Sequence, residues 1–374
     1  MLQFFCHKKF WLPLLIFVLL LITLEIFLRA GLYDKWLSPH SLLNNSIKRK
    51  AAIYEIGLDN IHWITLGDSR TDRGLAHELV QKEQAKKGLN HARLTFPRSK
   101  LPAYQTLSNW SYENLPNFQG ILLGMPQSNF AQPPNPFNQE IIVWAFKDYL
   151  PSDYINQQPV NNWTPFVNLY NKTYISDYLH DIKDLARRLS TRLQEINQRQ
   201  ANPNRLFFAG IKDKHKSNIC AYNLDKLKSC HLTAQNLSKK SQLNRQDRQI
   251  IRFCGNDAQK QQLDEKQIST YTEQWLRFFR QYLDKGISIT IILFPQHPIF
   301  DYLLNPDGTQ EVQRRTLNSL ANQADFRVID LRHIFSEKKI PPCSVFSDVT
   351  HFNPTGRQYF SNALIREIKK EPLK

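Results

Sequence analysis

Three residues that lie far apart in this sequence have side chains that together could perform nucleophilic catalysis. Ser69 stands in ITLGDSRTDRG, residues 64–74, and Asp348 and His351 stand in FSDVTHFNPTGRQYF, residues 346–360. A serine hydroxyl becomes an effective nucleophile when a histidine accepts its proton and a carboxylate orients that histidine. Each stretch alone is more typical of a capped turn than of a catalytic site. Whether they could act together depends on whether the fold brings them to one point.

The elements that must bring these residues together can be predicted from apolar runs of strand length. Such runs cover residues 62–67, 92–96, 120–124, 287–294 and 326–331. They are rich in β-branched or aromatic residues and continuous rather than alternating, which is typical of buried strands. Helical patterns separate most of them, at residues 74–87, 265–284, 311–322 and after Pro354. Alternating strands and helices predict an α/β fold with a parallel sheet covered on both faces.

This fold would let the two motifs converge on one point. Ser69 follows the first strand on a tight turn after Gly67, at the carboxyl edge where open α/β sheets bind ligands. The helix start after that turn offers backbone N–H groups to a developing oxyanion. Asp348 and His351 come just before the last helix, whose start is marked by Asn353 and the proline after it.

The N-terminus carries an apolar run over residues 10–28, interrupted only by Thr23 and Glu25. At about 1.5 Å rise per residue, this length covers the hydrocarbon core of a bilayer. Lys8 and Lys9 precede the run, as the positive-inside rule requires of a cytoplasmic start. The run exceeds an ordinary signal-peptide core and no Ala-x-Ala site follows, so an uncleaved anchor is favoured over a cleaved signal. Glu25 could reach the headgroup layer by snorkelling.

The chain is therefore divided as follows. We expect residues 1–31 to form a cytoplasmic start and anchor, residues 32–60 a juxtamembrane connector, and residues 61–370 an α/β domain on the extracytoplasmic side. An insertion at about residues 130–260 interrupts that domain. It contains an amphipathic helix near residues 175–198, whose apolar stripe indicates packing rather than a cofactor site.

Composition restricts the class of protein. A hydrophobic share of 41% is enough for a core, and 12% aromatic residues argue against a disordered chain. The net charge of +16 suits an anionic neighbourhood, such as lipid headgroups, an acidic cell-envelope polymer or nucleic acid. Nucleic acid is disfavoured because no recognisable binding motif occurs. No Cys-x-x-Cys occurs, which argues against a thiolate metal site. Cys220 and Cys230 could pair in an oxidising space, but their spacing does not fix the pairing.

A serine after the first strand, followed by Asp-x-x-His before the last helix, resembles the SGNH or GDSL hydrolase superfamily. The resemblance covers about residues 60–125 and 285–370. It implies a three-layer α/β/α, flavodoxin-like parallel sheet. It also implies that Ser69 is the nucleophile, His351 the base and Asp348 the residue that orients the base. The chemistry of such a triad needs no cofactor, and none is expected.

The segments expected to form the oxyanion hole depart from that family. Family members usually carry a glycine after the second strand and Gly-x-Asn-Asp after the third. Here the second strand leads into FPRSKLPAY, which has no glycine, and either Ser99 or a nearby backbone N–H is the candidate donor. The third strand leads into LLGMPQSNF, which keeps Gly124 and offers Gln127 or Asn129 as side-chain donors. The backbone N–H of Ser69 completes the set of candidates.

Similar departures, together with an N-terminal anchor, occur in a membrane-tethered branch of the superfamily. That branch includes the alginate O-acetylation proteins and the D-alanine transfer protein of teichoic acid synthesis, and LGDSRTDRG is similar to its nucleophile motif. Arg70 and Arg73 could hold an anionic substrate or pair with neighbouring aspartates. Asn353 is a further substrate-binding candidate. His297 is expected at the pocket rim, because LFPQHP resembles the loop after the fourth strand in that branch.

The sequence thus leads to one main functional hypothesis and one alternative. The main hypothesis is a single-pass protein of the cytoplasmic membrane, a serine esterase or O-acyltransferase that acts on an acylated envelope polysaccharide or anionic polymer. A multi-spanning membrane acyltransferase is the implied partner. The alternative is a noncatalytic protein on the same scaffold, which binds envelope polymer or tethers such an acyltransferase.

Overall fold

A computed structural model gives the structure of this chain. It describes residues 8–38, 41–97, 99–125, 130, 144–149, 173–201, 263–298, 307–348 and 350–371. Gln127 and Asn129, most of the predicted insertion, and Cys220 and Cys230 with their possible disulfide lie outside these residues.

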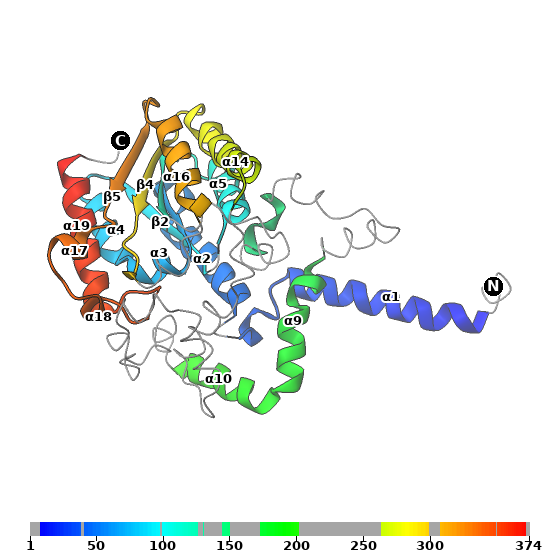
Figure 1. Cartoon of the computed structure of the whole chain (residues 1–374). Coiled ribbons are helices and arrows are strands. Elements are labelled where there is room, and N and C mark those ends of the chain that lie inside the picture. Colours follow the sequence, from blue (N-terminus) through cyan, green and yellow to red (C-terminus); the bar gives the residue numbers. More distant parts are fainter. Residues whose placement is uncertain are drawn as a thin grey trace, which may run out of the picture.

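A five-stranded sheet forms the centre of the structure (Figure 1). Its strands are β1 (Ile61–Gly67), β2 (Asn90–Thr95), β3 (Gly120–Met125), β4 (Ser288–Leu293) and β5 (Phe326–Asp330). They lie in the order β2-β1-β3-β4-β5, and every neighbouring pair is parallel. The predicted α/β class with a parallel sheet is therefore confirmed, and each strand lies where a continuous apolar run predicted it.

The continuous apolar runs form strands because both faces of the sheet are buried. In β3, Ile121 and Leu123 belong to one hydrophobic cluster and Leu122 belongs to another. In β4, Ile291 and Ile292 divide between the same two clusters. Successive side chains point to opposite faces of a strand, so a strand with two buried faces needs apolar residues at every position.

Helices follow each strand, as the alternation predicted. The main ones are α3 (Ser69–Gly74), α4 (His77–Ala85), α5 (Leu101–Asn114), α14 (Glu265–Leu283), α16 (Asp307–Leu320) and α19 (Pro354–Lys370), and the short α17 (Ile334–Glu337) and α18 (Pro342–Val345) precede α19. The helix predicted at residues 74–87 is α4, which begins at His77. Residue Gly74 belongs to α3, a separate helix that ends there. Helix α5 had not been predicted.

Helix α1 (Lys8–Arg29) projects away from the sheet (Figure 1). Its segment Trp11–Arg29 is long and apolar enough to cross a membrane, and most of its side chains are exposed. The expected N-terminal apolar helix is thus present.

The segment between α1 and the sheet is mostly helical. It contains η2 (Asp34–Trp36), α2 (Leu42–Ile56) and η3 (Leu58–Asn60). Ile53 of α2 is buried in the same hydrophobic cluster as β1 and β2, so α2 packs as part of the α/β core.

Two helices of the insertion are described, α9 (Tyr174–Arg187) and α10 (Leu189–Ala201), together with the short η5 (Trp144–Tyr149). The single helix expected near residues 175–198 is therefore two helices. The predicted packing role holds for Ile182 and Leu185 of the apolar stripe, which pack with residues of the segment after α1. It does not hold for Leu189 and Leu193, which are exposed.

Candidate active site

Two glycines at the carboxyl ends of neighbouring strands make room for the helix that begins at Ser69. Gly67 of β1 pairs in register with Gly124 of β3. A Cβ atom at Gly67 would lie 2.1 Å from the Thr71 hydroxyl oxygen, and one at Gly124 would lie 2.4 Å from it. The Thr71 hydroxyl donates to the Gly124 carbonyl oxygen at 3.0 Å. Thr71 thus fastens the first turn of α3 onto the sheet, and Gly124, a predicted oxyanion candidate, has a clear packing role.

Ser69 is the first residue of α3, directly after the residue that caps the helix. The Asp68 carboxylate accepts a hydrogen bond from the Arg70 N–H at 2.9 Å. This is the usual way in which an N-cap side chain satisfies a free N–H group of the first turn. The cap fixes the backbone on both sides of Ser69.

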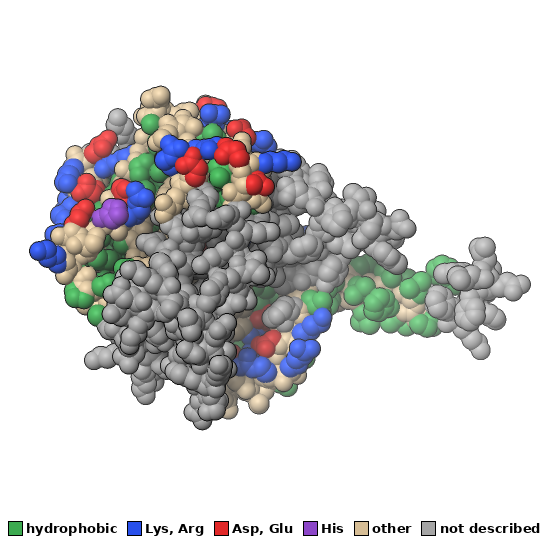
Figure 2. Space-filling view, viewed as in Figure 1, with side chains coloured by type: hydrophobic (Ala, Val, Ile, Leu, Met, Phe, Trp, Pro, Cys, Tyr) green, Lys and Arg blue, Asp and Glu red, His purple; other side chains and the backbone are tan. Residues whose placement is uncertain are grey.

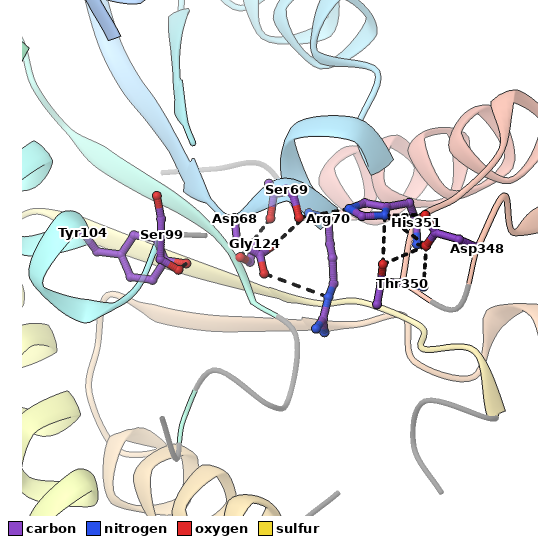
Figure 3. Close-up of polar contacts among 10 residues, drawn as sticks. Asp68, Ser69, Arg70, Ser99, Tyr104, Gly124, Asp348, Thr350 and His351 are labelled. Atoms are coloured by element: carbon purple, nitrogen blue, oxygen red, sulfur yellow. Dashed lines mark hydrogen bonds and ion pairs between the residues drawn. The ribbon is translucent and has the colours of Figure 1, made fainter. Parts of the chain in front are cut away.

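The structure brings Ser69 together with the two residues predicted as its partners (Figure 3). His351 Nε2 lies 3.0 Å from Ser69 Oγ, although 282 positions separate the two residues. His351 Nδ1 lies 3.0 Å from each carboxylate oxygen of Asp348. A carboxylate can only accept, so Nδ1 donates to Asp348 and the Nε2 lone pair faces the Ser69 hydroxyl. This is the tautomer that a Ser-His-Asp triad needs.

The Asp348 carboxylate is fixed by donors of its own turn. Its Oδ1 accepts from the Thr350 N–H at 2.8 Å, the Thr350 hydroxyl at 2.7 Å and the His351 N–H at 2.9 Å. Burial favours the neutral acid, but hydrogen bonds from His351 and Thr350 outweigh it and hold the pKa of Asp348 below its usual value. Asp348 is therefore a carboxylate at neutral pH.

Thr350 was not predicted as a site residue. Its hydroxyl oxygen lies 2.8 Å from His351 Nδ1 while its hydroxyl proton is donated to Asp348. Thr350 therefore contacts both Asp348 and His351, at the two atoms whose hydrogen bond orients the imidazole. Thr350 directly precedes His351, but nothing in the sequence indicates that its hydroxyl contacts the Asp348–His351 pair.

An aromatic cluster supports the loop that carries Asp348 and His351. Phe352, directly after His351, packs against Phe294 and Phe360, whose rings lie 4.4 Å apart between centroids. Gly74 at the end of α3 lies against the same two rings, Phe352 and Phe294. The cluster therefore joins α3, the loop after β4 and α19 beneath the triad.

Asn353, predicted as a substrate-binding candidate, is the N-cap of α19. Its side-chain oxygen accepts from the Gly356 N–H at 2.9 Å, and its side-chain amide donates to the Ser344 carbonyl at 2.9 Å. These bonds occupy both ends of the Asn353 amide. We therefore assign Asn353 the role of fixing the loop of the triad to α19.

The two arginines of the nucleophile motif lie in different surroundings. Arg70 is largely buried, and its Nε lies 4.0 Å from Asp68 Oδ2. Arg73 lines a cavity of about 430 Å³ together with Ser347, Asn353 and Arg357. Ser69, Asp348 and His351 do not line this cavity, so Arg73 lies beside the triad loop rather than at the triad.

His297 does not lie at a pocket rim as expected. It is 4% exposed, and its ring packs edge-on against Phe346 in the triad loop, 5.2 Å between ring centroids. Burial lowers the pKa of His297 to about 4, although the nearby Asp348 carboxylate opposes the shift. His297 is therefore a neutral packing residue beneath the loop.

Ser99 follows β2 and is buried, with 2% of its surface exposed. Its N–H donates to the Phe96 carbonyl at 3.2 Å, and its carbonyl accepts from the Tyr104 hydroxyl at 3.1 Å. The Ser99 hydroxyl has no hydrogen-bond partner within the described part of the chain. A buried hydroxyl without a partner is uncommon, so Ser99 Oγ has hydrogen-bonding capacity that the described residues do not use.

A buried ionic network behind Ser69 was also not predicted from the sequence. Asp72 Oδ1 accepts from Arg49 Nη2 at 2.5 Å, Arg93 Nη2 at 2.6 Å and the Thr95 hydroxyl at 2.6 Å. Burial favours neutral Asp72, but Arg49 and Arg93 outweigh it and lower the pKa of its carboxyl group. Asp72 had been considered only as a partner for a neighbouring arginine, whereas its actual partners come from α2 and β2. Local sequence gave no signal for a contact across so many residues.

The arrangement can take a proton from a serine hydroxyl and hold the resulting imidazolium beside a carboxylate. Among the described residues, no three His, Cys, Asp or Glu side chains gather into a group that could hold a metal ion. No protein-family model matches this chain, and no curated protein matches it at a significant level.

Proposed function

We propose that this protein is a membrane-anchored serine hydrolase or O-acyltransferase of the SGNH type, which acts on an acylated polymer of the cell envelope. The observation that carries this proposal is the hydrogen-bonded chain from Ser69 Oγ through His351 to Asp348, with both steps at 3.0 Å. Distances of about 2.6–3.2 Å are those at which a base can take the proton of its nucleophile.

In the proposed reaction, His351 Nε2 accepts the Ser69 proton while Ser69 Oγ attacks the carbonyl carbon of an ester. The imidazolium is stabilised by Asp348 and then gives its proton to the leaving alcohol, so that an acyl-serine remains. A polymer hydroxyl or a water molecule, deprotonated by His351, next attacks the acyl group and regenerates Ser69. Transfer and hydrolysis differ only in this second acceptor.

Two features beyond the triad support the SGNH assignment: the order of the strands and the buried Ser99 hydroxyl. The strand order 2-1-3-4-5 is one of the two common orders of doubly wound sheets, and ligands bind such sheets where the order reverses, here between β1 and β3. Ser69 follows β1 at that point. A three-layer α/β/α arrangement of the domain is part of the proposal. The unpartnered Ser99 hydroxyl is the proposed side-chain donor to the oxyanion.

The proposed location is the cytoplasmic membrane, with α1 as a single span and the α/β domain on the extracytoplasmic side. Cys343, in the short helix α18 before the loop of the triad, is disulfide-bonded, and disulfides persist mainly in oxidising compartments. The net charge of +16 suits an acidic envelope polymer as substrate. A multi-spanning acyltransferase that supplies the acyl group is the proposed partner.

The enzyme proposal is tested with a fluorophosphonate probe, which labels activated serines. Wild-type protein should be labelled, and Ser69→Ala and His351→Ala should each abolish the labelling. Ser336→Ala is the matched control, because the Ser336 hydroxyl is exposed and donates to the nearby His333 carbonyl. Labelling that persists in Ser69→Ala, or none in folded wild-type protein, would remove the enzyme proposal.

One observation favours the noncatalytic alternative. The Ser99 N–H is already donated to the Phe96 carbonyl, so that this backbone group cannot serve an oxyanion without rearrangement. If the wild-type protein is folded but unlabelled, binding of the envelope polymer to wild-type and Ser69→Ala protein should be equal. Equal binding without labelling would establish the scaffold function.

A further inference from the structure

The end of helix α1 and the start of helix α9 are joined by one carboxylate. Glu25 Oε1 accepts from the Tyr174 N–H at 3.0 Å, and Glu25 Oε2 accepts from the Ile175 N–H at 3.1 Å. The first N–H groups of a helix have no partner within it, and a carboxylate is the preferred ligand for them. Arg29 donates to the same carboxylate at 2.7 Å, and its guanidinium lies 4.7 Å from the centroid of the Tyr174 ring.

One face of α9 is then fixed by buried polar contacts to the segment after α1. The Tyr178 hydroxyl donates to Asp34 at 2.5 Å, and Asp181 accepts from the Tyr33 hydroxyl at 3.0 Å. Arg192, with no exposed surface, donates to Asp181 at 2.8 Å. Breaking a buried pair of this kind leaves an unpaired charge, so the contacts hold α9 in one orientation relative to α1.

These contacts set the level at which α9 lies if α1 crosses a membrane. Glu25 is one helical turn before Arg29, the last residue of the apolar segment Trp11–Arg29. Helix α9 therefore begins at the boundary between hydrocarbon and headgroups. In Figure 1, α9 runs across the direction of α1 rather than along it, which places it along the surface of the membrane.

The face of α9 opposite to these contacts is basic. At about 100° per residue, Lys183 and Arg187 lie about 140° and 180° around the helix from Tyr178. Both side chains are exposed, and neither forms an ion pair within the described residues. Figure 2 shows Lys and Arg side chains over α9 on the side toward which α1 projects.

We infer that the Lys183–Arg187 face of α9 lies on the membrane and binds the headgroups of anionic phospholipids. Cations next to a membrane are attracted to anionic lipids within a Debye length of the surface. This contact would hold the α/β domain at a fixed orientation above the bilayer, because α9 is fixed to the segment that leads into α2. The inference rests on the proposed anchor but not on the triad.

The test uses the full-length chain in nanodiscs that contain phosphatidylcholine and phosphatidylglycerol. A photo-crosslinking residue, benzoylphenylalanine, replaces Ala186, which is exposed beside the basic face. Mass spectrometry then measures which lipids become attached. We expect lipid adducts in which phosphatidylglycerol exceeds its mole fraction severalfold. The double variant Lys183→Gln with Arg187→Gln should lower that share to the mole fraction.

The matched control is Arg277→Gln with Arg280→Gln, two exposed arginines of α14, a helix that lies well apart from α9 (Figure 1). This variant should keep the wild-type preference. Protein that enters the nanodiscs but yields no lipid adduct, or adducts without a preference for phosphatidylglycerol, would overturn the inference while the anchor stands. Protein that does not enter the nanodiscs would overturn both.

Discussion

Arg49 and Asp72 form a buried ion pair that connects a helix preceding the sheet to the short helix that begins at Ser69. Arg49 Nη2 lies 2.5 Å from Asp72 Oδ1, and the two side chains are 7% and 9% exposed. Asp72 follows Ser69 by three residues, so the pair lies less than one helical turn from the proposed nucleophile. The backbone geometry of Ser69 therefore depends on a residue outside the sheet domain predicted from the sequence.

Replacing Arg49 with Met should destabilise the fold strongly. Removing one partner of a buried ion pair costs up to about 3–5 kcal/mol, and the remaining partner of Asp72, Arg93, should offset only part of this loss. Arg314→Met is the control, because Arg314 and Glu311 pair at the surface, where such pairs contribute about 0–1 kcal/mol. The free energy of unfolding of both variants is measured by denaturant titration of the detergent-solubilised protein, and we expect the larger loss in Arg49→Met. Equal losses in both variants would show that Arg49 has no special role.

The substitution Asp348→Asn should separate a catalytic aspartate from a capping one. If Asp348 orients His351, the variant should remain folded and lose about 10⁴-fold in kcat, since an amide favours the wrong imidazole tautomer. If Asp348 serves only the turn, the effect should be small, because Asn accepts the same backbone hydrogen bonds. Ester hydrolysis measured beside circular dichroism decides between them. A folded, fully active variant would refute the triad.

Thr350→Val should lower activity moderately through the position of His351. The variant keeps the shape of the side chain but loses its hydrogen bonds to Asp348 and His351, and a bond of this kind contributes about 0.5–1.5 kcal/mol. We expect kcat to fall by about tenfold at unchanged KM. Thr350→Ser, which restores the hydroxyl, should recover most of the loss. Failure of Ser to recover activity would assign Thr350 a packing role only.

Protonation of buried His297 should make the fold less stable in mild acid. Its pKa in the folded chain is about 4, against 6.5 when unperturbed. Between these values the unfolded chain binds more protons, so the free energy of unfolding falls as pH falls from 6.5 to 4. The shift corresponds to at most about 3 kcal/mol. The variant His297→Phe should show a shallower dependence over this window, measured by denaturant titration. An unchanged slope would contradict the assignment.

The residues that carry the proposed chemistry could be predicted because each stands directly after a strand or before a helix. The apolar runs of β1 and β4 are continuous, so their positions were clear, and Ser69 and His351 follow from the order of the elements. Helix α5 could not be predicted in this way. It buries Gln105, Thr106, Ser108 and Ser111 beside its apolar residues, so that no polar face distinguishes it from a loop.

Contacts between distant segments were the part that the sequence did not show. Arg49 meets Asp72 across 23 positions, and Glu25 meets Tyr174 across 149. The local sequence around Arg49 or Glu25 does not indicate the partner of that residue. A charged residue in a sequence gives the same signal whether its side chain faces solvent or a buried counter-ion. His297 was misplaced for a similar reason, since burial of a loop depends on what packs over it.

The packing of α2 also limits how the protein can be shortened for work in solution. A fragment that begins with β1 would lack Arg49 and would leave the carboxylate of Asp72 facing Arg93 alone behind the proposed nucleophile. A fragment that begins at Leu42 would keep Arg49 but would lose Tyr33 and Asp34, the partners of α9. Removing only the first 24 residues keeps Glu25, and with it every contact that ties α9 to the rest of the chain described above. The practical boundary of the folded unit thus falls inside the apolar helix rather than after it.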